Sequence, residues 1–278
     1  MDKNSPEYIK LSKSGRNSTK TFEKEYEYFL KEIDDYNKAR KMELHEINKI
    51  ITTGLAQQSV ALEGNSLKLG DSVIIWDALN GKNITNLPSA KELLPYAPEQ
   101  EVIELRNQLI LTKMVQETPI FDEEQLKKFH IILLQDTPME IIRGIGKVQR
   151  SGNYRLNPIL AKGYPLTIYP YPLEIQALMA ELFKFKTDIK DKLHPIVAAS
   201  RLLVTFLHIH PFHDGNGRMG RLLFMDYLIR NNYPPVLFSS INRTEYCDMV
   251  FEAQQGDATQ LYLCILETMK NFQIELIS

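Results

Sequence analysis

The sequence has few cysteines and no long apolar run, and each shortage excludes a class of protein. Cys247 and Cys264 are the only cysteines in 278 residues, which is too few for a disulfide framework and fits a reducing compartment. No apolar stretch approaches the roughly 20 residues of a membrane-spanning helix. Residues 1–20 are polar and lack the apolar core of a secretory signal. We therefore expect a cytoplasmic protein with no membrane segment.

Excess charge of one sign is also missing. The formal net charge is -2, which gives no general attraction to nucleic acid or to an anionic membrane. We therefore expect no nucleic-acid partner, and any anion site must be local. A chain of 278 residues that is 44% hydrophobic is long enough for a sizeable core in one large or two small domains.

Hydrophobic residues recur at helical spacing over most of the chain. The clearest pattern covers residues 22–64, as one long helix or two, and ends at Gly64-Asn65, a helix C-terminal signal. The segment 143–172 breaks the pattern, because its glycines and prolines suit turns and a short hairpin. The fold class is therefore all-α with one β-hairpin. Further helices are expected over residues 71–79, 89–96, 99–117, 122–134, 173–186, 195–208, 218–231, 242–255 and 257–275.

The segment HPFHDGNGRMGR, residues 210–221, concentrates groups that bind ligands. Its glycines allow the backbone of residues 215–217 to turn and align successive N–H groups as a nest for an anion. Arg218 and Arg221 then lie in the first turn of the next helix, where positive charge opposes the helix dipole. A bound polyanion would remove this conflict. Phosphates match both the arginines and the free N–H groups.

Two further residues of this segment could take part in chemistry. Asp214 could hold Mg²⁺, which binds one or two carboxylates together with phosphate oxygens. His210 could act as a general base. These groups together indicate transfer of part of a nucleotide to a hydroxyl. The alternative is a metal cluster of His208, His210, His213 and Asp214, which the nearby arginines disfavour. The glycines at 144–148 lack the pattern of a Walker A loop.

The same segment resembles the Fic-family signature H-x-F-x-[D/E]-G-N-G-R-x-x-R at every fixed position. The resemblance implies the Fic helical-bundle fold, with a short hairpin called the flap. It also implies an enzyme that moves AMP from ATP onto a Ser, Thr or Tyr hydroxyl of a protein, itself included. The matching residues are His210, Phe212, Asp214, Gly215, Asn216, Gly217, Arg218 and Arg221.

The resemblance also implies a role for each chemical group. His210 would deprotonate the target hydroxyl, and Asp214 would hold Mg²⁺. Gly215, Asn216 and Gly217 would form the anion hole for the phosphates. Arg218 would contact the β-phosphate side and Arg221 would hold the γ-phosphate of ATP.

A second stretch, SVALEGN at 59–65, resembles the family's inhibitory motif [S/T]-x-x-x-E-[G/N] through Ser59, Glu63 and Gly64. We expect Glu63 in the last turn of a helix, where its charge opposes the helix dipole, so a cationic partner is expected elsewhere. The resemblance implies that this partner is Arg221, and that the pair occupies the γ-phosphate position and inhibits the enzyme. The alternative is a surface glutamate beside a helix end.

The resemblance places the flap within GYPLTIYPYP, residues 163–172. An exposed hairpin edge there would dock the target protein by adding a strand from it, with Leu166, Thr167 and Ile168 at the contact. The alternative is a plain turn with surface tyrosines.

Weaker similarity extends over residues 50–260. Tyr246 in RTEYCDMVFEAQQGD matches a family tyrosine that would lie beside the adenine, whereas Cys247 and Gln254 replace the usual Tyr and Asn.

We divide the chain into an N-terminal helical region, residues 1–118, with the inhibitory motif, and a Fic catalytic core, residues 119–278, packed as one unit.

The sequence therefore predicts an ATP-dependent, Mg²⁺-requiring protein adenylyltransferase that is autoinhibited by Glu63. One alternative is removal of AMP from a modified protein at the same site, with Glu63 positioning a water. A second is a nucleotide-binding regulatory protein without transfer activity. The target protein, the nucleotide donor and homo-oligomer formation stay open.

Overall fold

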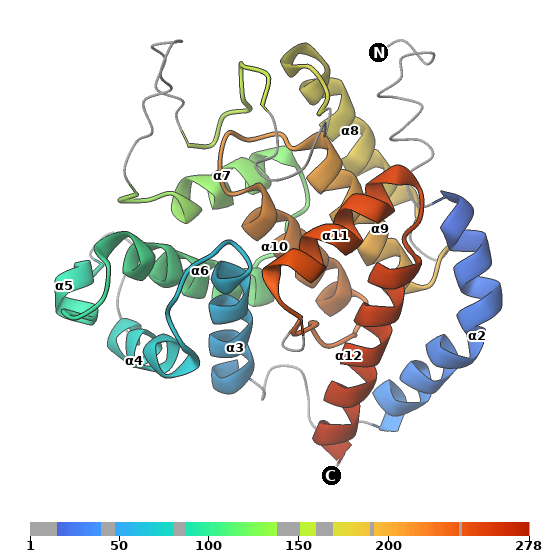
Figure 1. The fold of residues 1–278 in the computed structure, drawn as a ribbon, viewed down its shortest axis with the longest axis horizontal. Helices are drawn as coiled ribbons and strands as arrows, with labels where there is room; N and C mark the ends of the chain where they lie inside the picture. Colours follow the sequence, from blue (N-terminus) through green and yellow to red (C-terminus); the bar gives the residue numbers. More distant parts are fainter. Residues whose placement is uncertain are drawn as a thin grey trace.

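The computed structural model describes residues 16–39, 48–80, 87–137, 151–159, 169–189, 192–238 and 241–277. These residues form helices joined by turns and include no strand (Figure 1). The all-α prediction is confirmed for this part of the chain. The helices are α2 (Arg16–Ala39), α3 (Asn48–Ala61), α4 (Leu69–Leu79), α5 (Ala90–Leu93), α6 (Glu99–Glu117), α7 (Glu123–Leu133), α8 (Pro172–Asp188), α9 (Pro195–Ile209), α10 (Asn216–Arg230), α11 (Arg243–Gln255) and α12 (Thr259–Ile277).

Helices α9 and α10 form the centre of the bundle (Figure 1). Most residues of both helices are buried, which is the pattern of a helix that has neighbours on all sides. The two pack against each other, with α8, α11 and α12 against α9, and with α3 and α6 against α10. The loop that joins α9 to α10 is therefore supported at both ends by fully packed helices.

Helices α3 to α6 surround a small hydrophobic core of their own, which includes Ala56, Val60, Leu67, Ile75, Leu93, Leu94, Val102, Leu105 and Leu109. Helices α3 and α6 are also bonded directly, because Gln116 Nε2 donates to Thr52 Oγ1 at 2.8 Å. Leu111 and Val115 of α6 belong to the main core. These contacts hold α3 between α6 and α10. The division of the chain at residue 118 stays a prediction.

A buried carboxylate anchors α10. Asp226 is completely buried and accepts hydrogen bonds from Lys186 Nζ at 2.9 Å, Arg230 Nε at 3.3 Å and the Ile120 N–H at 3.2 Å. A buried charge persists only when it is paired in this way. The network fixes α10 relative to α8 and to the segment before α7.

The ends of the helices expected from residue 71 onward agree with the structure to within two residues, except that α5 covers only Ala90–Leu93 of the expected 89–96. The pattern over residues 22–64 belongs to two helices, α2 and α3, and the residues between them lie outside the described part. Helix α10 begins at Asn216, two residues before the expected start at 218. It begins there because Gly215 adopts a left-handed conformation and its carbonyl accepts the Met219 N–H at 2.9 Å.

The predicted hairpin is not confirmed. Residues 151–159 and 169–171 are described and form turns and extended chain with no strand. Leu166, Thr167 and Ile168 lie outside the described residues, so the flap stays a prediction.

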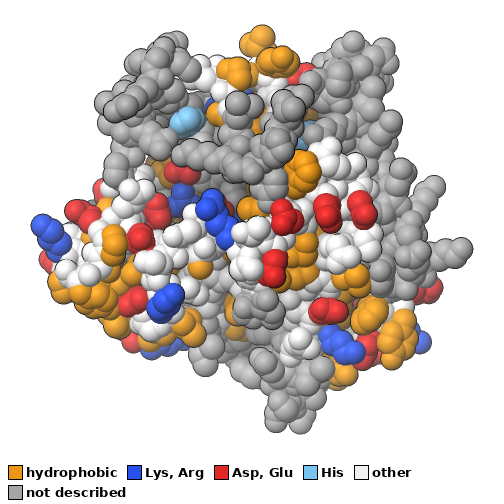
Figure 2. Space-filling view, viewed as in Figure 1, with side chains coloured by type: hydrophobic (Ala, Val, Ile, Leu, Met, Phe, Trp, Pro, Cys, Tyr) orange, Lys and Arg blue, Asp and Glu red, His pale blue; other side chains and the backbone are white. Residues whose placement is uncertain are grey.

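The described surface agrees with the low net charge. On the face drawn in Figure 2, acidic and basic side chains are interspersed. None of the described helices combines the length and apolar character needed to cross a membrane. Cys247 and Cys264 are both free thiols.

Candidate functional site

Hydrogen bonds between its own residues stabilise the loop that joins α9 to α10. Helix α9 ends at His210, which is left-handed (φ 49°, ψ 59°). The amide of Asn216 binds Phe212 twice: its Oδ1 accepts the N–H at 2.9 Å and its Nδ2 donates to the carbonyl at 2.8 Å. Gly215 is also left-handed, and a Cβ there would lie 2.8 Å from Leu133 Cδ2. Only glycine therefore fits this position.

His130 of α7 packs against the loop between α9 and α10 and was not predicted from the sequence. Its ring stacks on Phe212 with centroids 3.7 Å apart and 9° between the planes. Nδ1 accepts the Gly152 N–H at 2.8 Å, so the neutral ring carries its proton on Nε2, which donates to the Asp214 carbonyl at 3.0 Å. Burial lowers the pKa of His130 to about 4, so this arrangement is stable at neutral pH.

Arg155 was also missed, and it holds the backbone around His210. Its side chain is buried. Nε donates to the His210 carbonyl at 2.7 Å, Nη2 to the Pro170 carbonyl at 2.5 Å and Nη1 to the Asn157 carbonyl at 3.0 Å. Burial lowers the pKa of Arg155 to about 10, so it remains a cation that these carbonyls solvate.

His210 is prepared to accept a proton. Its Nδ1 lies 3.3 Å from the Leu207 carbonyl. A carbonyl can only accept, so Nδ1 carries the hydrogen and Nε2 keeps its lone pair. Burial, with a smaller effect of the Arg155 charge, lowers the pKa of His210 to about 4. Tyr169 lies over the imidazole, with ring centroids 4.3 Å apart. His210 is therefore a neutral, oriented base at physiological pH.

The first turn of α10 offers donors that have no acceptor in the helix. Its first backbone bond is donated by Met219, so the N–H groups of residues 216–218 precede the bonded turns. Arg218 is 4% exposed, and its Nη2 lies 3.3 Å from both Asp214 carboxylate oxygens. Its Nε and Nη1 are buried without a partner among the described residues. These donors and the positive helix end make an anion site.

Glu63 reaches this turn from the end of α3. After Ala61 the chain closes a Schellman turn, in which the Asn65 N–H donates to the Val60 carbonyl at 3.1 Å and the Gly64 N–H to the Ala61 carbonyl at 2.9 Å. Gly64 takes the left-handed conformation (φ 103°) that this turn requires. Glu63 is therefore the C-cap residue. The sequence pattern predicts instead that it lies in the last turn of the helix.

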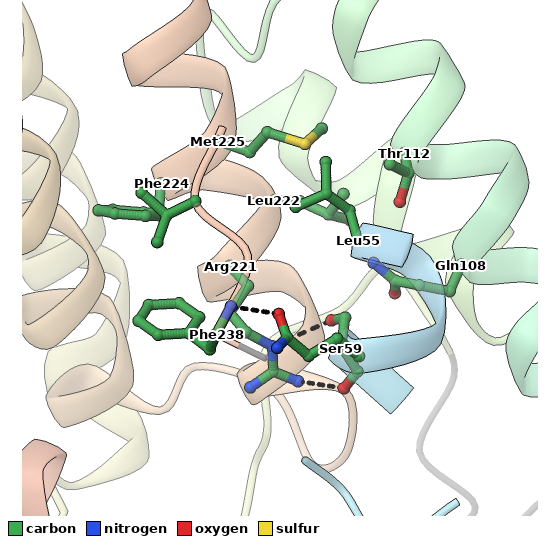
Figure 3. A pocket seen from close by; sticks show the side chains of 11 residues that line it. Leu55, Ser59, Gln108, Thr112, Arg221, Leu222, Phe224, Met225 and Phe238 are labelled. Atoms are coloured by element: carbon green, nitrogen blue, oxygen red, sulfur yellow. Dashed lines mark hydrogen bonds between the residues drawn. The ribbon is translucent and has the colours of Figure 1, made fainter. Parts of the chain in front are cut away.

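Arg221 binds both Ser59, as Figure 3 shows, and Glu63. Its Nη2 donates to Glu63 Oε1 at 2.7 Å and to the Ser59 carbonyl at 2.7 Å, and its Nε donates to Ser59 Oγ at 3.0 Å. The Arg221 side chain is 7% exposed and that of Glu63 is 38% exposed. A Cβ on Gly217 would lie 2.0 Å from Glu63 Oε1. The Glu63 carboxylate therefore lies directly against the first turn of α10.

Each member of this pair keeps the other ionised. Removal of water from Glu63 would raise its pKa, but the charge of Arg221 and its hydrogen bond, with smaller effects from Arg218 and Arg243, lower it overall. Burial would lower the pKa of Arg221, but Glu63 raises it. Because the folded pKa of Glu63 is depressed, its contribution is complete above the unfolded value of about 4.3 and is lost as the pH falls through the folded value.

Tyr246 of α11 lies beside the pair, with its ring centroid 5.5 Å from the guanidinium carbon of Arg221. Its ring packs edge-on against Phe238 at 5.4 Å. Burial raises the pKa of Tyr246 although Arg221 opposes this, so the phenol stays neutral. Cys247 is half-buried and Gln254 is buried. The fold thus brings Tyr246 to residues that were predicted to bind the nucleotide.

The histidine cluster considered as an alternative metal site is wrong. Within the described ranges no three His, Cys, Asp or Glu side chains are arranged to hold a metal, and His208 is buried inside α9. Asp214 differs, because its carboxylate is 62% exposed beside the first turn of α10. One exposed carboxylate next to the free donors of α10 fits Mg²⁺, which binds one or two carboxylates and takes its other ligands from phosphate oxygens and water.

Comparisons with known proteins find relatives of one family. Residues 120–228 match the model of the Fic/DOC family. The protein adenylyltransferase Fic of Drosophila willistoni is 27% identical over 234 residues, which cover 80% of this chain and 42% of that protein. The Drosophila melanogaster protein of the same name is 29% identical over 203 residues, which cover 72% and 37%. The chain spans about two fifths of the length of these curated relatives.

A solved structure shows the same fold. Fic-1 (residues 134–508) from C. elegans superposes with a TM-score of 0.73 at 18% identity, over 99% of this chain and 78% of that one. The predicted Fic helical bundle is therefore confirmed at the level of the fold.

We expect the imidazole of His210 to titrate with a pKa of about 4, well below the ordinary value of about 6.5, because burial disfavours the charged ring. NMR titration of the histidine ring signals checks this, with His210→Ala to assign the resonance. A His210 signal that moves near pH 6.5 would contradict a base that is neutral because it is shielded from water.

We expect His130→Phe to preserve the stack on Phe212 but to loosen the loop. The variant leaves the Gly152 N–H and the Asp214 carbonyl without their partner, at a cost of about 1–3 kcal/mol for the buried Gly152 N–H. Hydrogen exchange of peptides covering residues 210–217 should become faster. Lys128→Ala, at an exposed position of the same helix, is the control. Unchanged exchange in His130→Phe would show that the ring supports the loop by packing alone.

Proposed function

Because the chain carries a domain of the Fic/DOC family, we propose that it is a protein adenylyltransferase. It transfers AMP from ATP to a Ser, Thr or Tyr hydroxyl of a target protein, or of itself. One observation carries this proposal: a neutral His210, with a lone pair on Nε2, is in the loop that leads into a helix N-terminus with unpaired donors. A base beside an anion site is what transfer of a phosphate-containing group requires.

In the proposed reaction the target hydroxyl oxygen attacks the α-phosphorus of ATP, and the hydroxyl proton passes to His210 Nε2. The bond between the α-phosphorus and the oxygen that bridges to the β-phosphate breaks. Pyrophosphate leaves with that electron pair, and AMP stays on the target. Arg155 and Leu207 keep the imidazole and its backbone oriented during this step.

The phosphates would occupy the first turn of α10. The N–H groups of residues 216–218 and the unpaired Nε and Nη1 of Arg218 supply donors to them. Arg221 would hold the γ-phosphate once Glu63 has left it, and Tyr246 would border the adenine. Asp214 would hold Mg²⁺, which neutralises phosphate charge when bound.

Glu63 is the proposed inhibitor. Its carboxylate binds Arg221 and lies against Gly217, so a γ-phosphate and Glu63 compete for the same donors. Ser59 holds the other edge of the guanidinium, and Gly64 permits the turn that presents Glu63. The 38% exposure of Glu63 means that it can leave without unfolding α3.

The remaining assignments concern larger units. Residues 1–118 would form the inhibitory region and residues 119–278 the catalytic core. A target protein would dock at the flap, where Leu166, Thr167 and Ile168 would meet it. We also propose a cytoplasmic location.

A second candidate is removal of AMP from a modified protein. It is favoured by one observation: the Glu63 carboxylate is ionised, because Arg221 lowers its pKa, and it lies at the anion site. An ionised carboxylate there could orient a water toward the phosphorus of an AMP-modified side chain. The water oxygen would bond to phosphorus as the bond from phosphorus to the side-chain oxygen breaks, and the proton lost by the water would pass through His210 Nε2 to that leaving oxygen.

We expect Glu63→Gly to raise self-modification at least about tenfold, since loss of a charge-assisted contact of about 1.5 kcal/mol corresponds to that factor. Intact mass after incubation with ATP and Mg²⁺ measures the gain of AMP. Glu63→Gly combined with His210→Ala is the control and should stay unmodified. Labelling of that double variant would refute the base assignment, and a Glu63→Gly rate equal to wild type would refute the inhibition.

The reverse activity has its own test. Self-modified Glu63→Gly protein, freed of ATP, is incubated with fresh wild-type protein, and released AMP is measured. Release by wild type but not by fresh Glu63→Gly would establish AMP removal with Glu63 as a participant. Retention of all AMP in both incubations would reject it for the self-modified protein.

A further inference from the structure

A small cavity lies beside the contact between Arg221 and Ser59, where α3, α6 and α10 meet (Figure 3). The volume open to the centre of a water molecule is about 30 Å³. One water needs roughly 10–15 Å³ measured in this way. The cavity therefore has room for one or two waters and is too small for a nucleotide.

Two polar atoms of α6 are left unpaired at this cavity. Gln108 and Thr112 line it and are each 1% exposed. The Gln108 Oε1 and Thr112 Oγ1 have no hydrogen-bond partner among the described residues. Leaving such a group unsatisfied costs about 1–3 kcal/mol, so a polar ligand that pairs with both atoms would stabilise this part of the fold. Gln58, on the opposite wall, is already used, since its Oε1 accepts from the Phe238 N–H.

Ser59 connects the cavity to the inhibitory contact. It lines the same space, and its Oγ accepts from Arg221 Nε. Its own hydroxyl proton is donated in none of the hydrogen bonds found within the described ranges. Three groups thus surround the cavity: an acceptor on Gln108, a hydroxyl on Thr112 and a hydroxyl proton on Ser59. Two to four such partners are what a buried water normally has.

We propose that this cavity binds an ordered water molecule that bridges Gln108, Thr112 and Ser59, and that Gln108 and Thr112 are positioning residues for Arg221. The water donates to Gln108 Oε1 and accepts from the Ser59 hydroxyl, which orients the Ser59 lone pair toward Arg221 Nε. Helix α6 thereby helps to hold Arg221 on Glu63. The effect on activity rests on the proposed function, whereas the water site does not.

Thr112 offers a matched pair of variants in the full-length protein. Thr112→Val keeps the shape and removes the hydroxyl, and Thr112→Ser keeps the hydroxyl. Crystal structures would show the water in wild type and Thr112→Ser but not in Thr112→Val. NMR would follow solvent exchange of the Arg221 Nε–H, which we expect to be about three- to tenfold faster in Thr112→Val, the factor for a bond of about 0.7–1.4 kcal/mol. Thr112→Ser should exchange like wild type.

Activity adds the link to inhibition. Self-modification should rise about three- to tenfold in Thr112→Val and not in Thr112→Ser. Adding Thr112→Val to Glu63→Gly should not raise self-modification above that of Glu63→Gly alone. A variant that merely destabilised the fold would lose activity in both backgrounds.

The outcomes are separable. No water density in wild type, in a structure that shows other buried waters, would overturn the site. Density with unchanged Arg221 exchange in Thr112→Val would overturn the positioning role. If Glu63→Gly itself gains no AMP, the proposed function has failed, and density and exchange still decide the water site.

Discussion

A buried guanidinium at the positive end of a helix is the constraint on which the rest of this structure depends. Arg221 is 7% exposed in the first turns of α10, where the helix dipole and Arg218 both repel it. Such a charge is tolerated only with an anionic partner and hydrogen bonds. In this structure α3 supplies that partner, Glu63, from 158 positions earlier in the chain. In the proposed active state the γ-phosphate of ATP supplies it instead.

The proposed exchange of partners would account for the way α3 ends. The Schellman turn at Gly64 directs Glu63 toward α10, and the bonds of Ser59 hold the far edge of the guanidinium. Helix α3 is in turn held by α6. The position of Glu63 therefore depends on the packing of the N-terminal helices, so any partner that shifts α3 or α6 would also shift the contact between Glu63 and Arg221.

The loop from His210 to Gly215 shows the complementary arrangement, in which most polar groups are already used. Arg155 takes backbone carbonyls around His210, His130 takes that of Asp214, and Asn216 binds Phe212 on both sides. The groups left over are the Nε2 of His210 and the donors that begin α10, while the Asp214 carboxylate accepts the Gly215 N–H at 2.6 Å and still keeps 62% of its side chain exposed. A loop held this firmly need not rearrange when charge develops at a phosphate, which is how preorganised sites favour reaction.

The sequence by itself determined the features that depend on neighbouring residues. Helical spacing, the glycines of the loop and the arginines of the following turn lie within a few positions of one another, so local rules place them and predict an anion site. Glu63 was recognisable because its charge conflicts with a helix end. His130, Arg155, Gln108 and Thr112 carried no such signal, since each is an ordinary residue for its segment. Their roles come from partners as far as 84 positions away, or from a cavity between three helices. Only the tertiary structure decided these, because burial and hydrogen-bond geometry arise when distant helices pack.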